Sequence, residues 1–520
     1  MRNSRLFLLA GLALPLLCFS QQQALSTRAV NRILEQATWG PVPGASGTLQ
    51  TQGLDAWFAE QVAAPVSTYP DQPLFNSAGN TNTNLGPVQI AFFQNAVNGP
   101  DQLRQRIAFA LSEIWVISNL GINNASAFPP LLRIFQADAF ANYETLMRDV
   151  TLNPGMGRFL NMVNNDKANP VKGTSANENY GREVMQLFTL GLTQLNVDGT
   201  PVLDSKGVPL PTYTAADVTG VSRAFTGWTY PPMPGFNTSG HNRTYYIGPV
   251  VPLEYAHDAG AKTILGTKLP PNRTAEDDLT DAIHIIFMQP SLPPFVCQQL
   301  IQHLVTSNPS PAYISRVAEM FENNGSGVRG DLKAVIRAIL TDPEARTGDE
   351  ANALDQATFG HMREPVLFVA NLLRGLNGTV SSQSGIAGAA TNLGQQLFYA
   401  PSVFSYFSPQ YRGAGGLLAP EFQIYSTQTS GNRINLVNSV VYGGQYGAAT
   451  KFDISLYTTA ATVSTSHLVD VINTEFFHQD MSNNLQEALD QALAPLKLPS
   501  DKAKAALYVA LTSSEYQIIH

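Results

Sequence analysis

The carboxylate of Glu183 is the first candidate for chemistry in this chain. It lies in the segment NENYGREVMQLFTLG, and in a helical projection from Asn177 onward it falls at the edge of the apolar face. A carboxylate in that position must pair with a cation or face a pocket, because an unpaired buried charge is costly. Two interpretations stay open: a structural ion pair, with Arg223 or Arg158 as the partner, or a functional carboxylate.

Adjacent His257 and Asp258, in the segment EYAHDAGAKTILG, are the second candidate. A histidine beside a carboxylate can act as a general acid or base, or can bind a metal. Hydrogen bonding within the loop is the alternative. We take Glu183, His257 and Asp258 as the candidate catalytic residues of a hydrolase, provided that they share one cleft.

Further polar and aromatic side chains surround these three in the sequence. Glu178 and Arg182 are four residues apart in the order that favours an ion pair on a helix surface. The segment YTAADVTGVSRAFTGW begins a helix at Thr214. We expect the polar segments to meet, because isolated charges are not buried cheaply. The candidate binding residues are Asn177, Glu178, Arg182, Arg223 and Trp228.

Several familiar sites are missing from the sequence. It contains no G-x-S-x-G, P-loop or H-E-x-x-H motif. The chain has two cysteines, Cys18 and Cys297, so a zinc site built from cysteines is excluded. Cys297 shares a helical face with apolar residues and is interpreted as a buried thiol. The sequence therefore identifies no cofactor and no metal ligands.

The elements that position these residues are predicted to be helices, so the fold class is mainly α. Apolar residues recur at helical spacing along most of the chain. Turn signals between residues 195 and 213 predict one small β-hairpin insertion. The expected helices span residues 29–37, 103–114, 135–150, 177–191, 214–225, 274–288, 294–306, 312–324, 332–340 and 364–376, with two more between 467 and 513.

The length of the chain predicts two or three packed helical units rather than one. We divide the mature chain into an N-terminal unit at 21–230, a middle unit at 231–350 and a C-terminal unit at 351–520. The aromatic-rich run from Phe398 to Tyr425 has two interpretations. Its rings could bind sugars, or they could fix the loop to the core, and we favour the second.

Residues 1–20 are interpreted as a secretory signal peptide. Arg2 and Arg5 precede an apolar run that is too short to span a bilayer comfortably, and cleavage is expected after Ser20. Lipid attachment at Cys18 is the alternative. We therefore expect a secreted or periplasmic protein, with no transmembrane segment in the mature chain. Removing the two arginines changes the net charge from −8 to −10, which disfavours nucleic acid as a partner.

Taken together, these segments resemble the bacterial domain-of-unknown-function 1800 family over nearly the whole mature length. The resemblance implies an exported, helix-rich protein. It also implies a partner, because such proteins are frequently co-encoded with an exported phosphatase/sulfatase-like protein, but it assigns no activity. The segments that carry it are RILEQATWGPVPG, NENYGREVMQLFTLGL, YTAADVTGVSRAFTGW, HDAGAKTILG, the run from Ser307 to Arg346, REPV, APSVFSYFSPQY, APEFQI and YVALTSSEYQ.

This sequence departs from the wider family pattern at three positions. Many relatives resemble W-H-N-H-F where this chain has LSEIW, so Ser112 and Ile114 replace two histidines. Many also resemble E-L-H-T-L-G, where Phe188 replaces a histidine. If relatives bind a metal through those histidines, this chain keeps only His257 among the motifs.

Two functional hypotheses follow, and the sequence leaves open whether the protein is an enzyme. The first is an extracytoplasmic binding or scaffold protein of unknown biochemical function. The second is an extracytoplasmic hydrolase that uses Glu183, His257 and Asp258.

Overall fold

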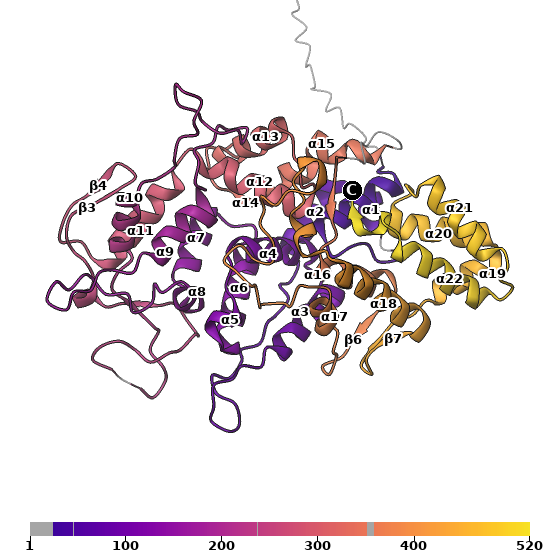
Figure 1. Ribbon diagram of the computed structural model, residues 1–520, viewed down its shortest axis with the longest axis horizontal. Coiled ribbons are helices and arrows are strands. Elements are labelled where there is room, and N and C mark those ends of the chain that lie inside the picture. The colour runs from indigo at the N-terminus through magenta and orange to yellow at the C-terminus, as the bar shows by residue number, and fades with distance from the viewer. Residues whose placement is uncertain (1–23, 45, 237, 351–357) are drawn as a thin grey trace, which may run out of the picture.

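The computed structural model describes residues 24–44, 46–236, 238–350 and 358–520, so the predicted signal peptide at 1–20 lies outside the described residues. The described chain is mainly α-helical, as predicted (Figure 1). Its α-helices are α1 (Thr27–Ala37), α2 (Ser46–Ala63), α3 (Gly86–Asn98), α4 (Gln102–Ile114), α5 (Asn119–Ile122), α6 (Phe128–Asp138), α7 (Tyr143–Thr151), α8 (Pro154–Phe159), α9 (Asn179–Glu183), α10 (Ala215–Ala224), α11 (Ala275–Phe287), α12 (Leu292–Leu304), α13 (Pro311–Glu322), α14 (Leu332–Thr341), α15 (Pro343–Arg346), α16 (Pro365–Gly375), α17 (Ala387–Asn392), α18 (Thr427–Gly443), α19 (Ser455–Val463), α20 (Thr465–Phe477), α21 (Asn483–Leu493) and α22 (Pro499–Thr512).

The strands are short, and all of their pairings are antiparallel. Three two-stranded sheets pair β1 with β2, β3 with β4 and β5 with β9, and a three-stranded sheet has the order β6-β8-β7. The strands are β1 (Trp228–Thr229), β2 (Val251–Pro252), β3 (Lys262–Ile264), β4 (Thr267–Leu269), β5 (His361–Met362), β6 (Thr379–Val380), β7 (Gln445–Tyr446), β8 (Thr450–Lys451) and β9 (Ile518–Ile519).

Side-chain caps fix where many of these helices begin. Thr214 forms a reciprocal capping box with Asp217 at the start of α10, and Thr274 accepts from the backbone amide of Asp277 at the start of α11. Asp331 caps α14 by accepting from the backbone amide of Ala334. Caps of this kind satisfy backbone amides that have no partner within the helix.

Figure 1 shows an elongated molecule with α9, α10 and α11 at one end, α4 near the middle and α19 to α22 at the opposite end. One hydrophobic core runs through it, with buried residues from all parts of the described chain. Helix α1 packs against α4, α14 and α20, and α3 packs against α16 and α17. These contacts cross both predicted unit boundaries, and the division into units stays a prediction.

The predicted helix at 135–150 is in fact two helices. Asn142 interrupts it by accepting from the amide of Glu144, which caps α7. The backbone amide of Tyr143 donates to the carbonyl of Gly330, so the chain between α6 and α7 pairs with another segment instead of continuing as a helix. The region 467–513 likewise holds three helices rather than two.

The predicted helix at 177–191 also differs from expectation. After α9 the chain forms a π-helical segment, η2 (Val184–Thr189), in which the amide of Leu190 donates to the carbonyl of Met185. The wider turn rotates the helix face, so Phe188 rather than Leu187 is fully buried. Residues 193–211 form two short hairpins held by isolated bridges, where one hairpin was predicted.

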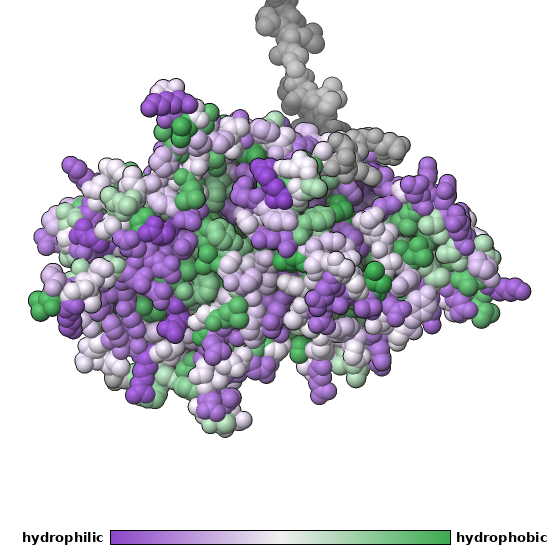
Figure 2. Space-filling model, viewed as in Figure 1, coloured by the Kyte–Doolittle hydropathy of each residue, from purple (hydrophilic) through white to green (hydrophobic). Residues whose placement is uncertain are grey.

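On the face drawn in Figure 2, hydrophobic and hydrophilic residues are interspersed, and several hydrophobic areas lie between the α9–α11 end and the middle of the molecule. Among the described residues, no helix combines the length and the apolar character that a membrane span requires.

Candidate functional site

The polar segments meet at the α10 end of the molecule, as predicted. Helix α9 packs directly on α10, where a Cβ atom on Gly181 would lie 2.4 Å from the Ser222 hydroxyl and 3.1 Å from its backbone nitrogen. On the outer side of this contact, the hydroxyl of Thr219 donates to Glu178 over 2.8 Å. The exposed ion pair between Glu178 and Arg182 forms at 3.1 Å, as the sequence predicted.

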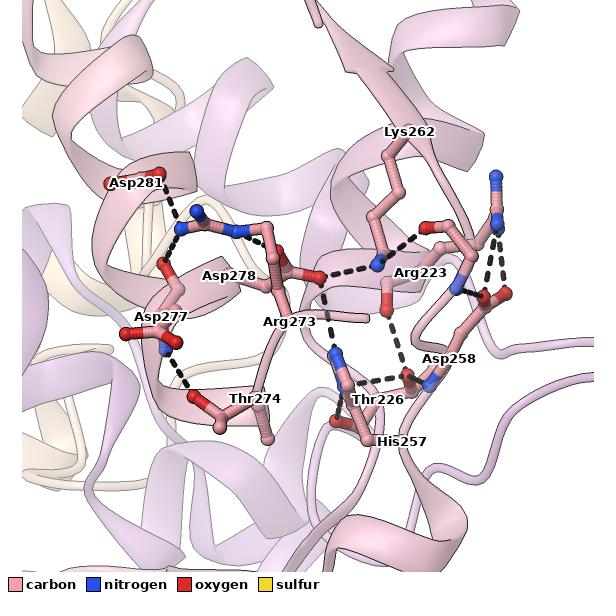
Figure 3. A network of polar contacts seen from close by, with 12 residues as sticks. Arg223, Thr226, His257, Asp258, Lys262, Arg273, Thr274, Asp277, Asp278 and Asp281 are labelled. Atoms are coloured by element: carbon pink, nitrogen blue, oxygen red, sulfur yellow. Dashed lines mark hydrogen bonds and ion pairs between the residues drawn. The ribbon is translucent and has the colours of Figure 1, made fainter. Parts of the chain in front are cut away.

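Arg223 pairs with Asp258, not with Glu183. Its guanidinium donates to both carboxylate oxygens of Asp258 over 2.6 and 2.9 Å, and to the carbonyl of Ala261 over 3.0 Å (Figure 3). The bidentate bond from Arg223 holds the pKa of Asp258 below its usual range. The interpretation in which Glu183 pairs with Arg223 is therefore wrong, because the loop after β2 brings a better placed carboxylate to the arginine.

His257 is buried, with 1% of its surface exposed, and both ring nitrogens face acceptors. Nδ1 lies 2.9 Å from the carbonyl oxygen of Thr226, and Nε2 lies 3.1 Å from Oδ2 of Asp278. Both ring nitrogens are therefore engaged by protein atoms. Gly227, at a φ of +79°, lets the chain pass this close, since a Cβ there would lie 2.7 Å from the backbone of His257.

Asp278, in the first turn of α11, is the centre of this network (Figure 3). It accepts from the buried ammonium of Lys262 and from Nε of Arg273, the latter over 2.7 Å. Burial raises the pKa of Asp278, but the hydrogen bonds from His257 and Lys262 outweigh it and hold the pKa below its usual range. The cavities described below are lined by other residues, and this network compensates its own charges.

The other predicted site residues have separate surroundings. Glu183 is half-buried, and burial raises its pKa against the opposing charge of Arg182. Its Oε2 atom has no hydrogen-bond partner among the described residues. Asn177 is held by two hydrogen bonds between its backbone and the Asn165 side chain, and Trp228 is buried in β1.

A second polar cluster, which the sequence analysis missed, lies in the middle of the molecule. Glu113 is on α4, His303 is on α12, and Glu364 directly precedes α16. One ligand atom from each of the three lies within 4.8 Å of the others. The amide nitrogen of Gln395 donates to both carboxylates, over 3.1 Å to Glu113 and 2.5 Å to Glu364.

Neighbouring groups extend this cluster. Nδ1 of His361 lies 3.1 Å from Oε1 of Glu421, and both residues are buried. The fully buried Arg106 donates to the backbone carbonyl of His303. Arg363 is taken up by a buried ion pair with Glu35, so it is not available to the cluster.

Burial shifts the pKa values of the cluster strongly. Burial and the charge of Glu364 raise the pKa of Glu113 well above its usual range, and burial raises the pKa of Glu421 to about 8. Burial and the charge of Arg106 lower the pKa values of His303 and His361 to about 3, so both rings are neutral at neutral pH. Shifts of this kind are frequent in functional sites.

Glu113 lies between two cavities. A cavity of about 30 Å³ is lined by Gln302, His303, Glu421 and other residues as well as Glu113. A larger cavity of about 490 Å³ is lined by Glu113, by glutamine side chains of α12, by Gln186 and Leu187 of η2, and by parts of the loop from Val403 to Leu418. Both cavities share Glu113, Gln299 and Gln302 in their walls. The π-helical segment therefore helps to line a ligand-sized space beside the cluster.

The sequence contains one signal of this cluster. On a helical projection of α4, Arg106 and Glu113 are seven residues apart and fall on the same side, next to the apolar stripe that includes Leu103 and Ile107. Glu183 has the same kind of position, at the edge of an apolar helix face. Glu364 and His303 gave no such signal, because His303 reaches the cluster only through the packing of α12 on α4, and Glu364 comes from a distant segment that precedes α16.

The chain matches the family described as protein of unknown function (DUF1800) over residues 32–518. It belongs to this family. No curated protein and no solved structure matches the chain. Membership in DUF1800 covers nearly the whole chain and assigns it no activity.

Three segments that carry the resemblance to DUF1800 supply residues of the central cluster and its surroundings. Glu35 comes from RILEQATWG, Glu364 from REPV and Glu421 from APEFQI. Two of the positions at which the resemblance predicts a departure lie close by. Ile114 lines the larger cavity next to Glu113, and Phe188 packs on Trp115 with ring centroids 4.5 Å apart.

Proposed function

We propose that this DUF1800 protein binds a small, neutral, polyhydroxylated ligand such as an oligosaccharide in the 490 Å³ cavity. The observation that carries the proposal is the composition of the cavity wall. It holds one carboxyl group, Glu113, and one guanidinium, Arg412, so few of its polar groups are ionisable. The remaining polar groups include five glutamine amides: Gln186, Gln298, Gln299, Gln302 and Gln410.

Glutamine amides suit a ligand that is rich in hydroxyl groups. Each amide offers two donors and one acceptor, and each hydroxyl offers one donor and two acceptor positions. The wall also contains the rings of Phe295 and Phe404. Apolar ring faces combined with a few polar groups are typical of ligand pockets.

Helix α12 gives one wall of the cavity a fixed geometry. Phe295, Gln298, Gln299 and Gln302 recur at helical spacing and therefore lie on one face of α12. The opposite wall comes from the aromatic-rich loop, in which Phe398 packs on Phe92 with ring centroids 6.2 Å apart. Phe398 is thus fixed to the core, the interpretation favoured from sequence, and under this proposal the ring of Phe404 contacts the ligand.

The cellular setting of this function stays a prediction. The resemblance to DUF1800 and the first twenty residues support export, and the acidic charge gives no support for nucleic acid as a partner. Under this proposal the protein acts outside the cytoplasm as a binding or scaffold protein, together with a co-encoded exported phosphatase/sulfatase-like protein. Co-purification of the two from the exported fraction supports the partnership, and separate elution contradicts it.

The alternative function, a hydrolase that uses Glu183, His257 and Asp258, has weaker support. Both ring nitrogens of His257 are engaged, and Asp258 is held by two bonds from Arg223. Neither residue has a free atom directed at one of the two cavities. A general base needs hydrogen-bond reach to its substrate, so the network favours a structural role.

A Gln298→Ala variant tests the proposed ligand site. Gln298 is on the cavity wall, and the loss of a hydrogen bond within a binding site costs about 1–2 kcal/mol, which weakens binding about tenfold. Isothermal titration with the strongest binder from a panel of neutral mono- to trisaccharides measures the change. Gln52→Ala, at an exposed position of α2, is the matched control and should bind like the unsubstituted protein.

A panel in which no saccharide binds contradicts the choice of ligand class. Equal loss of affinity in Gln298→Ala and Gln52→Ala contradicts the location of the site.

A further inference from the structure

The central cluster buries three carboxylates without a direct cationic partner. Glu113, Glu364 and Glu421 are each less than a tenth exposed. Among the described residues none of them forms an ion pair with a lysine or arginine, and their ionic contacts are limited to His303 and His361. A buried carboxylate normally has a partner, because its desolvation is costly.

The nearest cations do not remove this imbalance. Arg106 opposes the rise in the pKa of Glu364 through its charge, but its hydrogen bond goes to the carbonyl of His303. Arg433 donates to Gln517 and to the carbonyl of Arg363. The guanidinium of Arg106, which forms no ion pair with these carboxylates, can offset at most one of them.

Unpartnered oxygen atoms mark where a compensating group would lie. Oε2 of Glu113, Oε1 of Gln302 and Oε2 of Glu421 have no hydrogen-bond partner among the described residues, and each belongs to a side chain that is more than nine-tenths buried. All three residues line the 30 Å³ cavity. A space of that size holds one water molecule or one ion. Buried acceptors of this kind are uncommon in native proteins and call for an explanation.

We propose that Glu113, His303 and Glu364 bind one divalent transition-metal ion, of the Zn²⁺ or Mn²⁺ type, at the edge of this cavity, which Glu113 and His303 line. Their ligand atoms lie within 4.8 Å of one another. Ligands at about 2.0–2.2 Å from an ion lie about 3–4 Å apart, so the set needs only a small contraction. One imidazole with two carboxylates is a donor set that such ions accept.

The hydrogen bonds around the cluster agree with this assignment. Gln395 donates to both carboxylates and would orient them as an outer partner of the ion. Because Glu113 lines both cavities, the ion would lie at the boundary of the larger one. The metal site does not depend on the proposed saccharide.

Metal titration of the full-length protein tests the proposal. The protein is treated with a chelator, dialysed and titrated separately with ZnCl₂ and MnCl₂ in a calorimeter, and bound metal is counted by mass spectrometry after gel filtration. We expect one ion per chain for at least one of the two metals, together with a higher melting temperature. If neither metal binds stoichiometrically, protons or water compensate the cluster and the proposal is wrong.

Variants that replace a ligand by glutamine give a second test, because the melting temperature of the metal-free protein and its affinity for metal should change in opposite directions. Glu364→Gln removes one buried charge while keeping the shape, so the metal-free variant should melt at a higher temperature than metal-free wild type. The same variant should bind the metal more than about 100-fold more weakly, because loss of a ligand exceeds the effect of losing an outer partner. His303→Gln should also lose the metal.

His467→Ala is the matched control, since His467 is exposed on α20. It should bind the metal as wild type does. If Glu364→Gln retains wild-type affinity, the ion lies elsewhere and the assignment is wrong. These outcomes are independent of saccharide binding, which is measured with its own variant.

Discussion

Asp278 and Glu113 are both buried carboxylates, but their surroundings differ. Asp278 accepts from Lys262, Arg273 and His257, and these bonds hold its pKa below its usual range. Glu113 accepts from an amide and lies close to a second carboxylate, and burial raises its pKa. The first arrangement compensates its carboxylate within the protein, and the second leaves carboxyl groups that a ligand can bind.

At the residue scale, we expect Asp278→Ala to destabilise the protein by about 3–5 kcal/mol, because it leaves the ammonium of Lys262 buried without its carboxylate. Urea unfolding followed by circular dichroism measures the change. Arg182→Ala is the matched control. It removes an exposed ion pair with Glu178 and should cost less than about 1 kcal/mol.

Glu183→Ala should behave like the control, since Glu183 forms no ion pair among the described residues. If Asp278→Ala unfolds at the same urea concentration as wild type, the network of Figure 3 does not compensate the charge of Lys262.

At the element scale, the close approach of α9 to α10 sets the position of the π-helical segment that follows. Gly181 faces Ser222 without room for a side chain, which fixes the direction in which η2 leaves α9. Gln186 and Leu187 of η2 then line the cavity. A small residue in one helix contact thus decides where two wall residues of the proposed ligand site lie.

We expect Gly181→Ala to destabilise the protein by about 1–3 kcal/mol, because the new methyl group overlaps the backbone and hydroxyl of Ser222. Gly431→Ala, in α18, is the matched control. Its Cβ would meet open space, so it should stabilise the protein by about 0.5–1 kcal/mol through helix propensity. Melting curves of both variants give the comparison, and a loss of the same size in each would mean that close packing of α9 on α10 is not the cause.

At the scale of the whole molecule, the central cluster joins segments from distant parts of the chain, so its protonation is linked to global stability. The folded-state pKa of Glu421 is about 8, above its ordinary value of 4.5. The folded protein therefore holds this proton more tightly, and the stabilisation is present at low pH and lost as the pH rises to about 8. His303 and His361 act in the opposite direction. Their pKa values are lowered from 6.5 to about 3 in the folded protein, so the unfolded chain binds these protons first and stability is lost as the pH falls below about 6.5.

Between pH about 6.5 and about 8, only the carboxylates of the cluster contribute. We expect Glu421 to contribute about 2 kcal/mol to the fall in the free energy of unfolding of the chelator-treated protein across this window, from about 1.5 pH units at about 1.4 kcal/mol each. Urea unfolding at a series of pH values measures the slope. Glu421→Gln should reduce the fall by about 2 kcal/mol, and an equal slope in that variant would assign the effect to other groups.

The sequence by itself determined the mainly helical fold, the starts of α10, α11 and α14, the family and the meeting of the α9, α10 and His257 segments. Helical periodicity and capping depend on residues a few positions apart, so they can be read along the chain. Only the tertiary structure decided that Arg223 forms its ion pair with Asp258 instead of Glu183, and that η2 is π-helical. It also decided that Glu113, His303 and Glu364 lie close together. Those outcomes depend on which distant segments pack together, and burial then shifts the pKa values of the groups enclosed between them.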